Sequence, residues 1–333
     1  MMTPASPSAT QAPSDNARPQ NADRLREPFF LVGAERSGTT LLRLMLTHHP
    51  QIAWCSEFEY ATEQIPEAGG WPDLPAYRAW LASHRIFQAH GFAIDESLDY
   101  PRLMDSFLRQ TRDAQGKPII GATCHKWFDR LLRIWPDARF IHLVRDGRDV
   151  ARSCIGMGWA GNVYHGSTVW IEAEQLWDRL AAQLEPGRWV EVRYESLIAQ
   201  PQEELQRITA FMGVAFDPAM LRYAQNTSYA APDPSLTQQW RRKLTPREIQ
   251  LVEARIGDML AARGYELSGL PRIRVGAMRR AALAVQNRLA RIRFRQKRYG
   301  LGLWLADVVA RRVGIGADRV RQATHRIDTA HLK

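Results

Sequence analysis

The 333-residue sequence lacks the long apolar runs and the cysteine pairs that mark membrane-spanning and disulfide-stabilised proteins. No stretch reaches the ~18 apolar residues of a spanning helix, so we expect any membrane contact to be peripheral. The three cysteines, Cys55, Cys124 and Cys154, are an odd number without metal-ligand spacing, which predicts reduced thiols in a cytoplasmic protein. Residues 1–27 lack the apolar core of a signal peptide and predict a disordered N-terminal tail.

Acidic residues are missing from one segment, residues 271–300, which holds ten Arg or Lys. The net charge of +10 arises from 45 basic and 35 acidic residues, so without these ten the remainder is balanced. Apolar residues recur in 275–298 at spacings of three and four, with arginines between them. This pattern predicts a basic amphipathic helix, and we assign residues 269–333 to a basic helical extension.

Three interpretations of the extension remain open. It could bind an anionic membrane surface, at the inner face of the membrane for a cytoplasmic protein. Alternatively, it could pack on the chain's own domain or on a partner subunit, which would give a homo-oligomer through residues 271–313. Nucleic acid is disfavoured as a partner because the segment has no recognisable nucleic-acid-binding fold.

The rest of the chain alternates short apolar segments with amphipathic ones, which predicts an α/β fold. We expect a P-loop-like parallel sheet flanked by helices, within a domain of residues 28–268. The expected strands are 29–33, 117–124, 138–145 and 188–197. The expected helices include 39–49, 77–89, 100–114, 201–212 and 246–263. Residues 156–170 carry four glycines and break this alternation, so they predict either an active-site loop or a plain surface connection.

The apolar segment 29–32 is followed by "GAERSGTT", residues 33–40, which has the two glycines of a phosphate-binding loop. A strand, a glycine loop and a helix together aim backbone N–H groups at an anion. However, the lysine that follows the second glycine in nucleotide triphosphatases is absent, and Thr39 occupies its position. The cation is Arg36, inside the loop. A nucleotide kinase is therefore a poor fit, although it remains an alternative.

Two motifs resemble those of the sulfotransferases that use 3′-phosphoadenosine 5′-phosphosulfate (PAPS). "RSGTT", residues 36–40, is similar to the family's 5′-phosphosulfate loop, and "RDGRDVARS", residues 145–153, to its 3′-phosphate motif. The form "RSGTT" is typical of the branch that includes protein-tyrosine sulfotransferases and many bacterial enzymes. The resemblance implies the following donor-binding residues: Arg36, Ser37, Gly38, Thr39, Thr40, Arg145, Ser153 and Tyr194.

The resemblance also implies catalytic roles for three residues. The family spacing from Arg36 favours Glu57 as the general base, with Glu59 as the alternative, and Lys126 matches a lysine that contacts the sulfo group. The Asn and Pro that usually flank this lysine are absent. Three further residues, Trp240, Arg241 and Lys243, are candidates to cover the nucleotide.

The expected reaction is the transfer of the sulfo group of PAPS to a hydroxyl, with PAP as the second product. Because one phosphate and one sulfo group carry less charge than a triphosphate, we expect no metal. A glycan, a glycolipid or a lipid-linked metabolite is the favoured acceptor, and a peptide tyrosine is the alternative. A catalytically inactive binding module remains a third hypothesis, which the presence of Arg36, Glu57 and Lys126 disfavours.

Overall fold

The computed structural model describes residues 25–225, 227, 232–313 and 327. Most of the predicted N-terminal tail, residues 1–24, lies outside this part of the chain. So does most of the extension beyond Val313.

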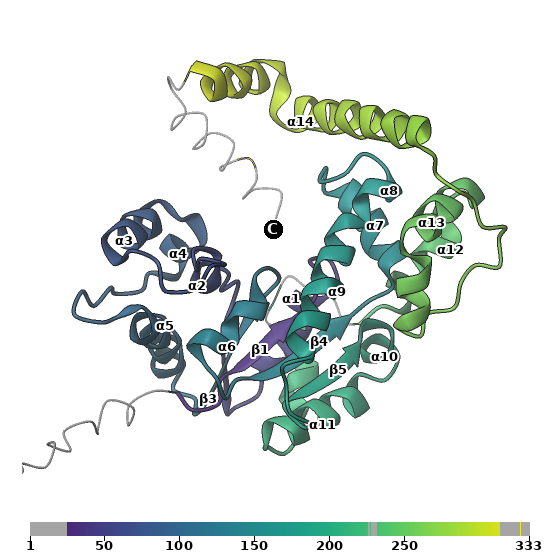
Figure 1. Ribbon diagram of the computed structural model, residues 1–333. Helices are drawn as coiled ribbons and strands as arrows, with labels where there is room; N and C mark the ends of the chain where they lie inside the picture. The colour runs from purple at the N-terminus through teal and green to yellow at the C-terminus, as the bar shows by residue number, and fades with distance from the viewer. Residues whose placement is uncertain (1–24, 226, 228–231, 314–326, 328–333) are drawn as a thin grey trace, which may run out of the picture.

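The described chain forms a parallel sheet of five strands in the order β2-β3-β1-β4-β5 (Figure 1). The strands are β1 (Phe29–Val32), β2 (Ile52–Cys55), β3 (Ile119–Cys124), β4 (Arg139–Val144) and β5 (Trp189–Arg193). In the central strand, Leu31 pairs with Thr123 on one side and with Ile141 on the other. Since all the strands are parallel, the segments that follow them meet at one edge of the sheet. The predicted α/β fold with a parallel sheet is confirmed.

Helices cover both faces of this sheet because its strands are apolar on both sides. The helices that precede β4 are α1 (Thr39–Thr47), α2 (Tyr60–Glu63), α3 (Leu74–Ser83), α4 (Arg85–His90), α5 (Tyr100–Gln115) and α6 (Leu131–Ile134). Those that follow it are α7 (Gly147–Gly156), α8 (Val163–Gly166), α9 (Thr168–Ala181), α10 (Tyr194–Ala199), α11 (Pro201–Met212), α12 (Gln239–Lys243), α13 (Pro246–Ala262) and α14 (Ala277–Val313). Short 3₁₀ segments lie at Phe128–Arg130 (η1), Pro218–Gln225 (η2) and Pro234–Leu236 (η3).

The alternation of side chains along β1 divides the core into two layers. Phe30 and Val32 pack with side chains of α2 to α6 and α9, whereas Phe29 and Leu31 pack with those of α1, α10 and α11. A third apolar cluster joins α7, α8, α9 and α13 beside the sheet, and Leu283 of α14 belongs to it.

Four expectations about the elements are corrected by the structure. The helix expected at 77–89 is two helices, α3 and α4, because the backbone of His84 is extended, which ends one helix and begins the next. β2 was not among the predicted strands, because its four apolar residues, unlike those of β1, are not followed by a glycine loop. The strand expected at 188–197 ends at Arg193, where α10 begins. The irregular segment expected at 156–170 is helical from Val163 onwards, because the Asn162 side chain accepts a hydrogen bond from the His165 N–H and begins α8.

The basic extension contains the helix α14, which arches over one end of the molecule (Figure 1). Its first half packs on the chain's own domain: Asn287 Oδ1 accepts a hydrogen bond from Gly161 N at 2.7 Å, and Asn162 Nδ2 donates one to Leu283 O at 2.9 Å. Gly300, with a φ of 77°, interrupts the helix. In the described part of the chain, no helix is long and apolar enough to cross a membrane. The contact with an anionic membrane or with a partner subunit stays a prediction.

Candidate active site

The glycine loop lies between β1 and α1 and approaches its neighbours closely at both glycines. A Cβ atom on Gly33 would lie 2.3 Å from the carbonyl oxygen of Leu143, and one on Gly38 would lie 2.4 Å from the Tyr194 ring. Gly38 also has a φ of 97°, and Arg36 a φ of 72°, so the loop turns through left-handed conformations. This turn makes Gly38 the N-cap of α1 and directs the first N–H groups of that helix out of the sheet edge.

The segments at the two predicted motifs contact each other directly, although they lie more than 100 residues apart. Arg36 Nε donates a hydrogen bond to Ser153 Oγ at 3.0 Å, and Arg145 Nη1 donates one to the carbonyl oxygen of Arg36 at 3.1 Å. The guanidinium of Arg145 also lies 4.2 Å from the centre of the Tyr194 ring. Four of the positions that the family resemblance selected for donor binding, Arg36, Arg145, Ser153 and Tyr194, therefore lie together.

These residues line a cavity of about 370 Å³, which we call the donor cavity. Its lining includes Arg36, Gly38, Thr39, Thr40, Arg145, Ser153 and Tyr194. Two buried polar atoms beside it, Arg145 Nε and Ser37 Oγ, have no hydrogen-bond partner among the described residues. Buried polar groups are nearly always hydrogen-bonded, so these two atoms fit the oxygens of a bound anion. The donor cavity thus suits a ligand that carries phosphate groups.

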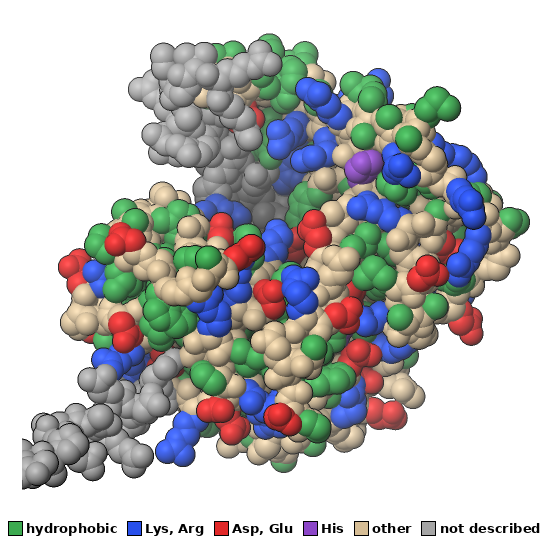
Figure 2. All heavy atoms as spheres, in the orientation of Figure 1, with side chains coloured by type: hydrophobic (Ala, Val, Ile, Leu, Met, Phe, Trp, Pro, Cys, Tyr) green, Lys and Arg blue, Asp and Glu red, His purple; other side chains and the backbone are tan. Residues whose placement is uncertain are grey.

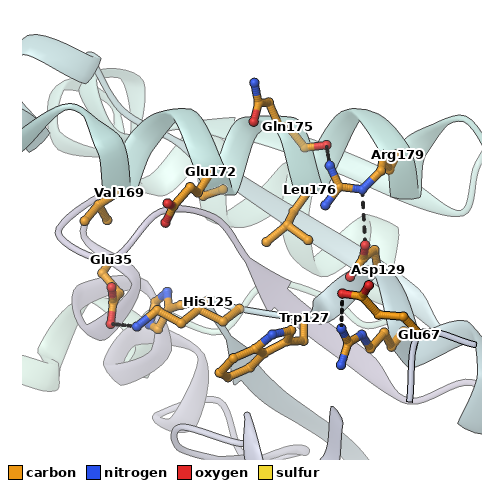
Figure 3. A pocket seen from close by; sticks show the side chains of 13 residues that line it. Glu35, Glu67, His125, Trp127, Asp129, Val169, Glu172, Gln175, Leu176 and Arg179 are labelled. Atoms are coloured by element: carbon orange, nitrogen blue, oxygen red, sulfur yellow. Dashed lines mark hydrogen bonds and ion pairs between the residues drawn. The ribbon is translucent and has the colours of Figure 1, made fainter. Parts of the chain in front are cut away.

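A second cavity of about 430 Å³ lies on the other side of the loop, and we call it the adjoining cavity (Figure 3). Lys126 lines it, and the Lys126 Nζ forms an ion pair of 3.3 Å with Glu35. One wall is α9, which presents Glu172, Gln175, Leu176 and Arg179. Glu35 lines the adjoining cavity, and the next residue, Arg36, lines the donor cavity. The glycine loop therefore lies between the two cavities.

Lys126 is positioned by its neighbour His125. The His125 Nδ1 lies 3.0 Å from the carbonyl oxygen of Gly33, and its Nε2 lies 3.5 Å from Thr39 Oγ1. Because a carbonyl only accepts, Nδ1 carries the proton and Nε2 is free to accept from the threonine hydroxyl. His125 thus connects the end of β3 with the glycine loop, and only its position beside Lys126 in the sequence could have indicated this.

The two candidate bases, Glu57 and Glu59, have different surroundings. The chain turns at Glu59, whose φ and ψ are −57° and −31°, so the two carboxylates do not lie on one side of an extended segment. Glu59 Oε1 accepts a hydrogen bond of 2.8 Å from His125 N, and burial raises the pKa of this carboxyl. Glu57, by contrast, is exposed. It follows β2 at the same sheet edge, although it lines neither of the two cavities.

Arg148, one of the charged residues between Arg145 and Ser153, is buried and forms two ion pairs. Arg148 donates to both carboxylate oxygens of Asp146 and to Glu253, and its guanidinium lies 3.6 Å from the centre of the Trp240 ring. Trp240 is therefore packed inside the protein, and the suggestion that it covers the nucleotide is wrong. Asp149 accepts hydrogen bonds from the backbone N–H groups of Gln239 and Trp240 and so fixes the start of α12.

The remaining candidate residues have structural surroundings. All three cysteines are buried and unpaired, and burial raises the pKa of Cys55 and of Cys154 to about 12. Among the residues that the structure describes, no three His, Cys, Asp or Glu side chains lie together in a way that could hold a metal ion.

Comparison with known proteins agrees with this geometry. The sulfotransferase family pattern matches residues 28–218. The chain is 27% identical over 206 residues to a putative protein-tyrosine sulfotransferase of Caenorhabditis briggsae, which covers 59% of this chain and 68% of that protein. It is 28% identical over 289 residues to nodulation protein NoeE of Sinorhizobium fredii, which covers 72% of this chain and 66% of that protein.

Solved structures show the same fold. The sulfotransferase domain of the Synechococcus olefin synthase is similar with a TM-score of 0.51 at 20% identity, over 75% of this chain and 98% of that domain. The matches span between 43% and 72% of the length of curated relatives. Since the family pattern covers more than half of the sequence, the chain belongs to the sulfotransferase family.

Proposed function

We propose that the protein transfers the sulfo group of PAPS to a hydroxyl of its acceptor, with Arg36, Arg145 and Ser153 holding the donor. The observation that carries this proposal is the contact of Arg36 with both Ser153 and Arg145 at the donor cavity. A phosphate needs such a guanidinium fork, and Arg145 stands at the end of β4, where it can provide one.

The residues of the donor cavity divide between the two ends of the nucleotide. Ser37, Thr39 and Thr40, with the first N–H groups of α1, would hold the 5′-phosphosulfate, because they belong to the loop and to the helix N-terminus. Arg145 and Ser153 would hold the 3′-phosphate. Tyr194 packs against both Gly38 and Arg145, and so keeps the two anion-binding groups at a fixed separation.

The chemistry at the acceptor requires a base and charge stabilisation. Glu57 takes the proton of the acceptor hydroxyl while the hydroxyl oxygen forms a bond to the sulfur of PAPS. The bond between sulfur and the 5′-phosphate oxygen breaks, and PAP leaves. Lys126 and Arg36 stabilise the negative charge that develops on the sulfo and phosphate oxygens. Glu59, hydrogen-bonded to His125 N, holds the Glu57 segment beside Lys126.

We favour a sugar hydroxyl, on a glycan, a glycolipid or a lipid-linked metabolite, as the acceptor. The adjoining cavity supports this choice, since Glu35, Glu67, Asp129 and Glu172 supply hydrogen-bond acceptors and Trp127 supplies an aromatic ring (Figure 3). The alternative is a peptide tyrosine, in keeping with the names of several relatives.

Two experiments test the acceptor and the donor. The purified chain is incubated with radiolabelled PAPS and a cell extract, and the labelled product is identified by mass spectrometry. We expect a sulfate ester on a sugar, and a labelled peptide would select the alternative. Thermal unfolding decides the donor: PAP should raise the Tm, and ATP with Mg²⁺ should not. A Tm that is raised by ATP with Mg²⁺ but not by PAP would contradict the proposal.

A further inference from the structure

A third cavity of about 380 Å³ lies beneath α14, and we call it the arginine pocket. Arginines and aromatic rings dominate its lining, which consists of Arg85, Met157, Gly158, Trp159, Arg291, Phe294, Arg295, Arg298 and Tyr299. No Asp or Glu is found among these described lining residues. On the face drawn in Figure 2, several Lys and Arg side chains gather in the hollow below α14.

The wall that α14 contributes is fixed in place by specific contacts. The hydrogen bonds of Asn287 with Gly161 and of Asn162 with Leu283 hold the helix one to two turns before the pocket. At the pocket itself the Phe294 ring lies against Gly158, so closely that a Cβ atom there would lie 2.1 Å from the ring. The positions of Arg291 and Arg295 relative to the 157–159 segment therefore follow from packing.

Two of the arginines that line this pocket have no acidic partner in the part of the chain that the structure describes. Arg291 and Arg295 lie one helical turn apart, and neither forms an ion pair with a described residue. Both side chains are exposed, and like charges at this spacing repel one another weakly, so an anion bound between them would relieve the repulsion. Guanidinium groups match the oxygens of a phosphate, and the flanking rings of Trp159 and Phe294 can pack against the rest of a ligand.

Both sides of the arginine pocket are connected to the proposed active site. On one side, Arg85 begins α4, and His90 at the end of that helix lies 2.8 Å from the Oγ of Ser56, the residue before Glu57. On the other side, Met157 N donates a hydrogen bond to the carbonyl oxygen of Ser153, which lines the donor cavity. The pocket is therefore next to the segments that hold the base and the donor.

We propose that the arginine pocket binds a phosphate group of the acceptor, while the acceptor hydroxyl lies at Glu57. This inference rests on the proposed function, and it narrows the acceptor to a hydroxyl compound that also carries phosphate. A soluble phosphate ester and a lipid headgroup share this chemistry.

The test uses the full chain with its donor cavity filled by PAP, so that added phosphate cannot bind there. Glycerol 3-phosphate is then titrated by calorimetry into the wild type and into an Arg291→Gln/Arg295→Gln variant. The control variant is Arg293→Gln/Lys297→Gln, which removes two cations at the same spacing. At about 100° per residue these two positions lie on the side of α14 away from the pocket.

We expect saturable binding to the wild type and to the control, and a Kd about tenfold or more higher for the pocket variant, because two charge-assisted contacts are lost. No saturable binding to the wild type, or an equal loss in both variants, would overturn the proposal. Failure of the proposed function would instead appear as an absence of PAP binding in all three proteins.

A vesicle experiment separates the two sources of phosphate. Flotation with phosphatidylcholine vesicles, with and without phosphatidic acid, presents the same phosphate on a lipid. Because the pocket and control variants lose equal charge, non-specific attraction falls equally in both. A larger loss in the pocket variant supports a lipid acceptor, and binding of glycerol 3-phosphate alone supports a soluble one. Equal flotation of both variants together with absent glycerol 3-phosphate binding refutes the pocket.

Discussion

At the scale of single residues, Arg145 connects more parts of the donor cavity than any other side chain described above. It donates to the carbonyl oxygens of Arg36 and Leu236, lies 3.7 Å from Asp149, and stacks on Tyr194. Its Nε is buried without a partner among the described residues. This arrangement keeps the guanidinium in one orientation before the donor binds, which lowers the entropy cost of binding.

Replacing Arg145 with alanine should therefore weaken PAP binding far more than the binding of adenosine 5′-phosphate, which lacks the 3′-phosphate. A hydrogen bond to a charged group contributes about 1.5–3 kcal/mol, so we expect the Kd for PAP to rise by about 10- to 100-fold. Calorimetry with both nucleotides measures this difference. The loss of the Arg145 contacts with Arg36 and Leu236 should affect both nucleotides alike. An equal loss of affinity for the two nucleotides would therefore exclude a role of Arg145 in binding the 3′-phosphate.

Glu57→Gln should lower the turnover by about 10²- to 10⁴-fold while PAP still binds, because the amide cannot accept the proton of the hydroxyl. Transfer from radiolabelled PAPS and PAP titration give the two values. Glu59→Gln is the matched control, since its amide oxygen can still accept the hydrogen bond from His125 N. If Glu59→Gln were inactive and Glu57→Gln fully active, Glu59 would be the base.

At the scale of elements, the junction of β1 with α1 depends on a glycine that no other residue can replace. Gly38→Ala would place a methyl group against the Tyr194 ring and hold an L-residue at a φ of 97°. A left-handed conformation costs about 1–2 kcal/mol at a non-glycine residue, and the clash would shift the loop or the ring. We expect PAP affinity to fall by about tenfold or more, as measured by calorimetry.

The control for this substitution is Gly156→Ala at the end of α7. A Cβ atom there would meet nothing within 4 Å, and the residue has no positive φ. Alanine at such a position should leave PAP affinity unchanged and leave the Tm unchanged or slightly higher. A similar loss of PAP affinity in both variants would show that the Gly38 effect is not local to the loop.

The elements differ in how well the sequence predicts them. The strands β1 and β4 are mostly apolar and are followed by Gly33 and Arg145, and helix α11 matches the prediction at both ends, because Pro201 begins it and Gly213 follows it. The strand β2 has as many apolar residues as β1, but no glycine loop follows it, and a short apolar run by itself does not identify a strand. The different environments of Glu57 and Glu59 depend on the turn into α2, which local pattern does not reveal.

The position of α14 shows a second limit of prediction from the sequence. Its amphipathic pattern is visible in the sequence, but the pattern does not say what the helix packs against. That depends on pairs such as Asn162 with Leu283 and Asn287 with Gly161, which are more than 100 residues apart. The arginine pocket arises from the same contacts.

At the scale of the whole molecule, a buried charge network joins the sheet to the helices beside it. The ring of His142 on β4 is fully buried between Glu174 of α9 and Glu191 of β5, each 3.5 Å away, and stacks on Trp177. Burial by itself would lower the pKa of His142, but the two carboxylates outweigh it and raise the pKa. The same contacts hold the pKa of Glu174 and of Glu191 below the ordinary value.

The sign of this shift predicts how stability depends on pH. Because the pKa of His142 is higher in the folded chain, its protonated form stabilises the fold. This contribution is complete below the unfolded pKa of about 6.5 and is lost as the pH rises through the higher folded value. His142→Gln should therefore lower the Tm most at mildly acidic pH, and the difference from the wild type should shrink towards alkaline pH.

Thermal unfolding of both proteins across this pH range measures the effect, and a change of about 1 kcal/mol shifts the Tm by about 2–4 °C for a domain of this size. His165→Gln is the control. Burial and the neighbouring Arg255 lower the pKa of His165, so its protonation destabilises the fold and its removal should help most on the acid side. If the Tm difference between wild type and His142→Gln grew with pH, the two glutamates would not hold a protonated His142.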